Sequence, residues 1–148
     1  QNLAKKAGVE QSTIFTGHVQ PQSAPLYLAL SDVLVIPTID TISGRYAMPT
    51  KIFEYMAIGK PIVATNLEAH CQILEDGKTG LLIKPSDPIE LALAVERVYH
   101  NKEFAKSMAA NAKKVAYTEF TWRKRAERIE NFLRQHSFLY KNRSENQE

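Results

Sequence analysis

The sequence has little cysteine, no long apolar run and no marked excess of either charge. Its single cysteine, Cys71, excludes a disulfide framework and argues against a cysteine-based zinc site, and it fits a reducing compartment. No apolar run reaches the roughly 18 residues of a membrane span, and no signal peptide is recognisable. The formal net charge of +3 is too small and too diffuse to indicate a nucleic-acid partner. These absences favour a cytoplasmic globular protein.

The composition that is present, 44% hydrophobic and 24% charged, is ordinary for a soluble globular domain. The 148 residues allow one domain or a large part of one. Because the chain begins at Gln1 inside a helical pattern, we interpret it as a fragment of something longer. Residues 141–148 lack any apolar side chain and are expected to form a disordered tail, which leaves residues 1–140 as the folded part.

Basic side chains gather near the start of the last helix. They are Arg123, Lys124, Arg125 and Arg128. Such a cluster is usually a solvated helix face, and a contact with another domain or a peripheral contact with the inner face of a membrane stays open.

Short apolar runs alternate with amphipathic segments until residue 83, after which only helical patterns follow. The expected strands cover residues 13–16, 32–36, 61–65 and 81–83. The expected helices cover residues 2–8, 23–30, 49–59 and 68–74, followed by three that begin at caps Asp87, Asn101 and Thr121. The order predicts an α/β fold with a parallel sheet that ends in several α-helices.

For a few side chains the sequence makes more specific predictions. Asp87 is followed by Pro88 and Glu90, which together predict a capping box with proline at the first helical position. Leu26 and other leucines of helix 23–30 are expected to make apolar contacts, and Trp122 is expected to pack in the core.

A long connection, residues 37–48, separates the strand at 32–36 from the helix that opens at Pro49. Most connections of this kind have about 2–6 residues, and long ones at the carboxyl end of a parallel strand usually contact ligand. The amides of Thr50 and Lys51 lie in the first helical turn, where they lack intrahelical acceptors. With the helix dipole and the Lys51 ammonium, they are suited to bind an anion.

Glu54 lies one turn further along the same helix, beside Thr50 and Lys51. A carboxylate there can accept hydrogen bonds from a ribose diol, so phosphate at the helix start and ribose one turn on suits a nucleoside diphosphate. From the pattern alone, a solvated ion pair between Lys51 and Glu54 is the more common arrangement.

Other polar side chains give weaker signals. Arg45, in the long connection, fits either a phosphate contact or a solvated position. His70 and Cys71 are adjacent but have no second ligand pair, so the sequence predicts no metal site.

From about Val9 to Trp122 the chain resembles the C-terminal half of group 1 (family 4) glycosyltransferases of the GT-B fold. Four segments carry the resemblance, in order. They are residues 15–19 (FTGHV), 31–38 (SDVLVIPT), 51–65 (KIFEYMAIGKPIVAT) and 75–83 (EDGKTGLLI).

The resemblance implies a partial Rossmann-like parallel sheet, a GT-B C-terminal half lacking its first two strands. In the family order 3-2-1-4-5-6, their absence leaves a gap beside the strand at 13–16. It also implies the donor-binding part of a retaining hexosyltransferase, which moves a sugar from a nucleotide-diphosphate sugar to an acceptor hydroxyl. The acceptor, a glycan or lipid-linked glycan, would bind a missing N-terminal domain. No metal or other cofactor is implied, and the fragment alone is expected to be inactive because the family's pyrophosphate-binding Arg and Lys lie in the missing strands.

The family's roles fall on particular positions. Glu54 matches the second glutamate of the E-x7-E motif, which holds the donor ribose. Thr50 and Lys51 match the helix start that meets the pyrophosphate. The loop that lines the nucleobase is matched by Gly17, His18 and Val19.

The sequence departs from the family at the first glutamate of E-x7-E, where it has Tyr46. In relatives that carboxylate holds the hydroxyls of the donor sugar; here Tyr46 and Met48 are the candidates for lining the sugar site. The Pro49-x-Lys51 helix start resembles a subset of the family that lacks the first glutamate, and Gln72 replaces a frequent glutamate.

Two alternatives to the transferase remain open. Tyr46 is compatible with a non-catalytic nucleotide-sugar-binding or regulatory module. A GT-B sugar-nucleotide epimerase would need added acid/base groups around the sugar, and residues 38–48 offer only Asp40.

Overall fold

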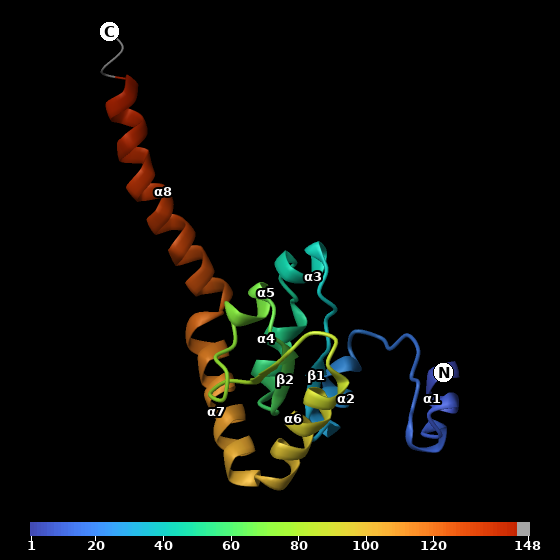
Figure 1. Cartoon of the computed structure of the whole chain (residues 1–148). Coiled ribbons are helices and arrows are strands. Elements are labelled where there is room, and N and C mark those ends of the chain that lie inside the picture. The colour runs from blue at the N-terminus through green and yellow to red at the C-terminus, as the bar shows by residue number, and fades with distance from the viewer. Residues whose placement is uncertain (145–148) are drawn as a thin grey trace. The chain divides into compact units, whose positions relative to one another are not determined.

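The computed structural model describes residues 1–144 and divides into two compact units, Gln1–Leu30 and the chain from Ser31 onward. The first unit holds three short helical segments and no buried residue. They are α1 (Asn2–Lys6), the 3-10 helix η1 (Glu10–Ser12) and α2 (Ala24–Leu30). The helices expected at 2–8 and 23–30 are thus present (Figure 1).

The strand expected at residues 13–16 is not formed. Ile14 is 90% exposed, and none of the three strands in the described chain pairs with this segment. A single strand is not stable without a neighbour that supplies ladder hydrogen bonds, which accounts for the difference. The expected apolar contacts of α2 are also absent for Leu26 and Leu30, which are 67% and 83% exposed.

The second unit is built on a parallel sheet in the order β1-β2-β3. Its strands are β1 (Leu34–Ile36), β2 (Ile62–Thr65) and β3 (Leu81–Ile83). Three of the four expected strands and the α/β class are confirmed. Every residue of the central strand β2 is buried, as suits a parallel strand covered on both faces.

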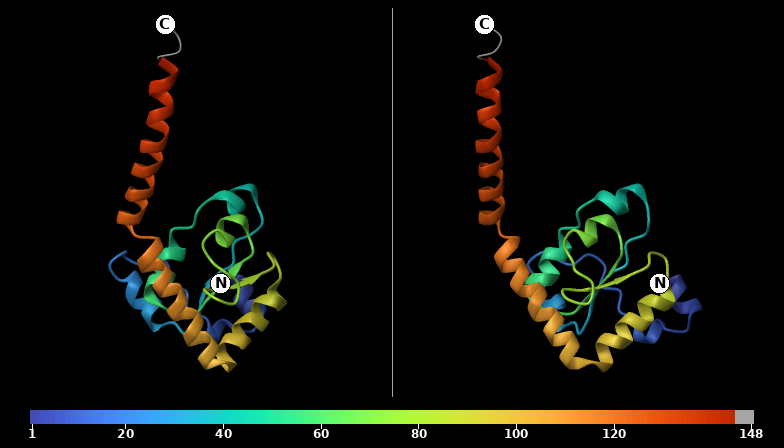
Figure 2. Two further views of the ribbon diagram at one scale, coloured as in Figure 1. Left: turned by 90° about the vertical axis from the view of Figure 1, so that its left-hand side faces the viewer. Right: turned by 60° about the vertical axis from the view of Figure 1, so that its left-hand side comes forward.

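Six helices complete the second unit (Figures 1 and 2). They are α3 (Ile42–Tyr46), α4 (Lys51–Ile58), α5 (Glu68–Cys71), α6 (Pro88–His100), α7 (Lys102–Glu119) and α8 (Trp122–Ser144). Five of them were expected, and α3 was not, because the connection 37–48 shows no helical period. Gly59 ends α4 in the left-handed conformation, with φ of 77°.

Side chains of β2 alternate between two apolar clusters, because successive residues of a strand point to opposite faces. On one face Ile62 and Ala64 pack with Ile52 and Met56 of α4 and with the second half of α7. On the other face Val63 packs with α6 and the first half of α7. Helix α7 therefore spans both clusters, running beside α4 and meeting α6 at a bend (Figure 2).

The helix caps follow the sequence, with one difference. Asp87 Oδ1 accepts from the amides of Ile89 and Glu90 at 3.1 and 3.0 Å, and Asn101 Oδ1 accepts from Phe104 at 3.1 Å. The expected capping box is wrong in its second half. Glu90 Oε2 accepts from the amide of Lys84 at 2.9 Å and so ties the incoming loop to the first turn of α6.

Helix α8 corrects two expectations. Trp122 is 86% exposed at its start, so it does not pack in the core. The helix also continues through residues 141–144, where a disordered tail was expected, and residues 145–148 lie outside the described part. Lysine and arginine have good helix propensity, so a helix already begun extends through such a segment.

Candidate functional site

The carboxyl ends of β1 and β2 define the candidate site. Because the two strands are parallel and adjacent, the segments that follow them leave the same edge of the sheet. The segment after β1, residues 37–50, contains α3 and leads into α4. In open α/β sheets this edge is where ligands bind.

The start of α4 presents free backbone donors. The amides of Ile52 and Phe53 donate to the carbonyls of Pro49 and Thr50, each at 3.1 Å. Those of Thr50 and Lys51 have no acceptor within the described residues. The Thr50 side chain makes no cap bond, and both residues are exposed. The helix start therefore keeps two amides and an ammonium for an anion.

Glu54 lies on the exposed side of α4, opposite the buried Ile52 and Met56. It makes no hydrogen bond or ion pair with any residue in the described part of the chain. The solvated pair with Lys51, the more common arrangement for this spacing, is thus not formed. Burial of the neighbouring Tyr55 phenol raises the pKa of Tyr55, and the negative charge of Glu54 raises it further.

The connection 37–48 is an ordered loop built around α3. Thr41 Oγ1 caps α3 by accepting from the Gly44 amide at 3.0 Å. Arg45 donates from Nη2 to Asp40 Oδ2 at 2.9 Å and from Nε to the other carboxylate oxygen. Arg45 is therefore engaged by a carboxylate, and its hydrogen bonds hold the pKa of Asp40 below its ordinary value.

The two candidates for the sugar site lie at the end of this loop. Tyr46 closes α3 and is 71% exposed, and Met48 is 48% exposed. Both precede Thr50 by a few residues, so Tyr46, Met48, Thr50, Lys51 and Glu54 lie along one continuous loop and helix.

Three other candidates belong to the first unit, and the structure describes them only within it. Gly17 has φ of 65°, a left-handed conformation that glycine adopts without a Cβ penalty. His18 is exposed and Val19 is partly buried. Their proposed role at the nucleobase stays a prediction.

His70 was considered only as a metal ligand from the sequence, and the structure gives it a different environment. Its side chain is 1% exposed, at the carboxyl end of β2. Nδ1 lies 2.6 Å from the Thr65 carbonyl oxygen, and Nε2 lies 3.4 Å from Thr38 Oγ1. Its position just after a buried strand was the one available signal.

The neighbouring Cys71 is turned elsewhere. Its thiol donates to Asn66 Oδ1 at 2.8 Å, and burial is the first of the causes that raise the pKa of this thiol. Among the residues that the structure describes, no group of three His, Cys, Asp or Glu side chains is placed to hold a metal ion.

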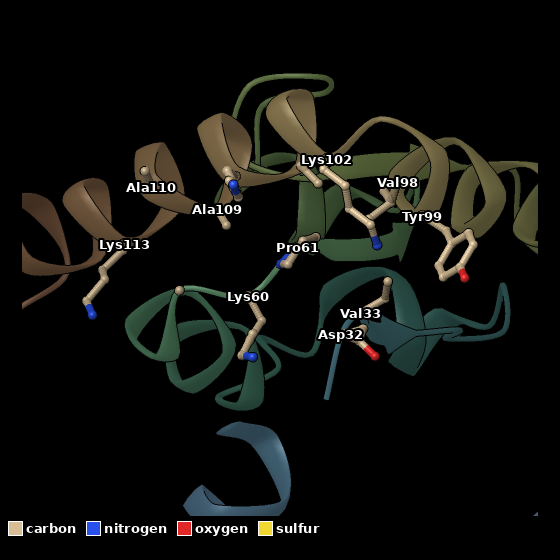
Figure 3. A pocket seen from close by; sticks show the side chains of 13 residues that line it. Asp32, Val33, Lys60, Pro61, Val98, Tyr99, Lys102, Ala109, Ala110 and Lys113 are labelled. Carbon is tan, nitrogen blue, oxygen red and sulfur yellow. The ribbon is translucent and has the colours of Figure 1, made fainter. Parts of the chain in front are cut away.

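A pocket of about 500 Å³ lies at the opposite edge of the sheet, where Val33 and Pro61 lead into β1 and β2 (Figure 3). Lysines of α7 and Lys60, in the connection between α4 and β2, surround it, with Lys102 Nζ 4.3 Å from the centre of the Tyr99 ring. Since it is at the amino ends of the strands, it is separate from the candidate site.

Sequence comparison now identifies the family. The sequence model described as "Glycosyl transferases group 1" matches residues 1–115. The chain belongs to the group 1 glycosyltransferases. An uncharacterised glycosyltransferase of Methanocaldococcus jannaschii is 28% identical over 122 residues, covering 82% of this chain and 30% of that protein. A GDP-mannose-dependent phosphatidylinositol monomannoside mannosyltransferase of Mycobacterium tuberculosis is 26% identical over 136 residues, covering 90% and 35%.

Solved structures agree on the fold of this glycosyltransferase chain. Anabaena HepE in complex with UDP superposes with a TM-score of 0.80 at 23% identity, covering 90% of this chain and 35% of that one. The fold is that of a GT-B C-terminal, Rossmann-like half. The chain spans about a third of the length of the curated relatives it matches. Within the described residues, no helix is both long and apolar enough to cross a membrane.

Proposed function

We propose that this chain is the donor-binding part of a retaining glycosyltransferase, which moves a sugar from a nucleotide-diphosphate sugar to an acceptor hydroxyl of a glycan or lipid-linked glycan. The observation that carries the proposal is the start of α4, where two amides and the carboxylate of Glu54 have no partner among the residues that the structure describes and, with Lys51, lie on one exposed face. Support comes also from HepE, a structural neighbour solved with UDP and with UDP-glucose.

Each group has a distinct task in this proposal. The amides of Thr50 and Lys51 bind the pyrophosphate, and the Lys51 ammonium with the helix dipole stabilises the charge that grows on the leaving diphosphate. Glu54 accepts hydrogen bonds from the ribose hydroxyls. These groups make a catalytic metal unnecessary. Tyr46 and Met48 line the sugar in this proposal, and the base is assigned to Gly17, His18 and Val19.

Tyr46 favours a second candidate, a non-catalytic nucleotide-sugar-binding module. In relatives a carboxylate at this position holds the hydroxyls of the donor sugar, and tyrosine supplies only one hydroxyl there. A non-catalytic module would bind the nucleotide sugar without transferring the sugar. Detectable sugar transfer by the protein at its natural length separates the enzyme from the module.

Calorimetric titration of UDP and GDP into the protein at its natural length tests the proposal. Glu54→Ala should weaken binding of the preferred nucleotide about tenfold or more, since a charge-assisted hydrogen bond contributes about 1.5–3 kcal/mol. Glu96→Ala is the matched control, because Glu96 is also an exposed glutamate on a helix, α6, away from the candidate site. Equal binding by wild type and Glu54→Ala would contradict the assignment of the ribose to Glu54.

A further inference from the structure

His70 joins the ends of two neighbouring strands. Thr65 is the last residue of β2, and Thr38 lies two residues beyond β1, at the base of the loop 37–48. The imidazole lies between them, almost fully excluded from water. A third contact joins the Thr65 hydroxyl oxygen and Nδ1 at 3.4 Å. A buried polar ring is costly unless its nitrogens are bonded, so these contacts matter to its position.

In the neutral ring, the contact with the Thr65 carbonyl decides which nitrogen of His70 donates a hydrogen bond and which accepts one. A carbonyl oxygen only accepts, so Nδ1 carries the hydrogen and donates to the Thr65 carbonyl at 2.6 Å. Nε2 is then the acceptor, and the Thr38 hydroxyl donates to it across 3.4 Å. The short bond holds the ring, and the ring in turn holds the base of the loop.

The loop beyond Thr38 is held by several contacts of its own. A Cβ at Gly44 would lie 2.3 Å from the Ile39 carbonyl oxygen, so only glycine allows this close approach. The ion pair between Asp40 and Arg45 ties the two sides of the loop, and α3 packs against α5, the helix that carries His70. An anchor at the base of such a loop sets the position of its far end.

We propose that His70 is a positioning residue of the donor site, which holds the loop 37–48 so that Tyr46, Met48 and the start of α4 meet the donor. This inference rests on the proposed function. His70 does not touch the donor; it acts through Thr38 and the loop. A five-residue helix such as α3 is marginal by itself, so it depends on this anchor and on its packing against α5.

Three variants separate the contacts of His70. His70→Leu removes every polar contact of the ring and keeps the site filled, and Thr38→Val removes only the Thr38 hydroxyl. His70→Gln is the conservative variant, because its amide reaches toward the Nε2 position and can accept from Thr38. Val98→Ala, buried in the apolar cluster on the other face of the sheet, controls for general loss of stability.

Hydrogen exchange measures the protection of backbone amides in the loop 37–48 without any ligand. The amides of Gly44, Arg45 and Ala47 are bonded within α3, to Thr41 and Ser43. We expect them to exchange about three- to tenfold faster in His70→Leu and Thr38→Val, the effect of losing one hydrogen bond. His70→Gln should restore part of the protection, and Val98→Ala should leave these amides unchanged relative to the rest of the chain.

Calorimetry with UDP and GDP on the protein at its natural length measures how these variants change the affinity for the nucleotide. His70→Leu and Thr38→Val should each weaken binding about three- to tenfold, and the double variant should be no weaker than His70→Leu, because both act through one contact. Partial recovery in His70→Gln would support positioning over a merely structural role.

Unchanged exchange in the loop would overturn the proposal whatever the nucleotide does. Faster exchange with unchanged affinity would overturn it as well, since the anchor would then not serve the donor. If the wild type binds neither nucleotide, the proposed function fails and the positioning role fails with it, while the exchange data still show whether His70 anchors the loop.

Discussion

Replacing Met56 by alanine removes a fully buried side chain from the contact between α4, the sheet and α7. Met56 is 0% exposed and packs in the cluster that contains Ile52 and Ile62. Loss of such a side chain costs about 2–5 kcal/mol, the sum of lost transfer free energy and a cavity that neighbours fill only in part. Since domains of this size are stable by about 5–15 kcal/mol, the variant should lose a large share of the free energy of unfolding.

Urea unfolding followed by circular dichroism measures this loss. For a slope of about 2 kcal/mol per molar urea, a loss of about 2–5 kcal/mol should lower the midpoint by about 1–2.5 M. Glu54→Ala is the matched control two residues away, on the exposed side of the same helix, and its free energy of unfolding should stay within about 0.5 kcal/mol of wild type. A loss below about 1 kcal/mol for Met56→Ala would refute the packing described for α4.

Three further predictions concern single interactions. Asp87→Ala should lower the free energy of unfolding by about 1 kcal/mol in urea titrations, because the first turn of α6 loses its cap; an unchanged midpoint would argue against the cap. In a carboxyl NMR titration Asp40 should show a pKa below its ordinary value of 3.8, and in Arg45→Gln its pKa should return to that value. The ion pair therefore stabilises the fold above pH 3.8, and this contribution is lost as the pH falls through the lowered pKa of Asp40. The thiol of Cys71, whose raised pKa leaves less thiolate, should alkylate more slowly at pH 8 than a cysteine in an unstructured peptide, and an equal rate would contradict the raised pKa and the hydrogen bond to Asn66.

The sequence was sufficient to predict the central α/β unit because several signals agreed there. Pro49 and Gly59 bound an amphipathic helix, and the apolar runs beside it have the length of buried parallel strands. The observed α4, β1 and β2 follow these signals within two residues. Asp87 likewise marks the start of α6 through its side-chain bonds.

Elements that depend on tertiary context were not predictable in the same way. Residues 13–16 have the composition of a strand, but a strand needs a partner, and the described sheet offers them none. Helix α3 lacks an apolar period and contains Gly44, and its start depends on the Thr41 side chain. Trp122 is large and apolar, yet it is exposed, because composition alone does not say whether a neighbour covers a helix face.

The sequence was sufficient to propose the binding groups of the candidate site, but not the contacts that hold those groups in place. Glu54 and the start of α4 follow from spacing on one helix, which is a local property. The contact between His70 and Thr38 joins residues 32 apart in the sequence, and nothing in the pattern around either residue indicates it. That Glu54 has no partner within the described part of the chain was also visible only in the structure.

The most direct test of the account is whether Glu54 recognises the ribose. Calorimetry should compare UDP with its 2′,3′-dideoxy analogue, or GDP with its own analogue, in wild type and Glu54→Ala. We predict that wild type binds the natural nucleotide about tenfold or more tightly than the dideoxy analogue, and that Glu54→Ala binds both equally. If Glu54→Ala keeps the full preference for the ribose hydroxyls, Glu54 does not hold the ribose and the donor site at the start of α4 is contradicted.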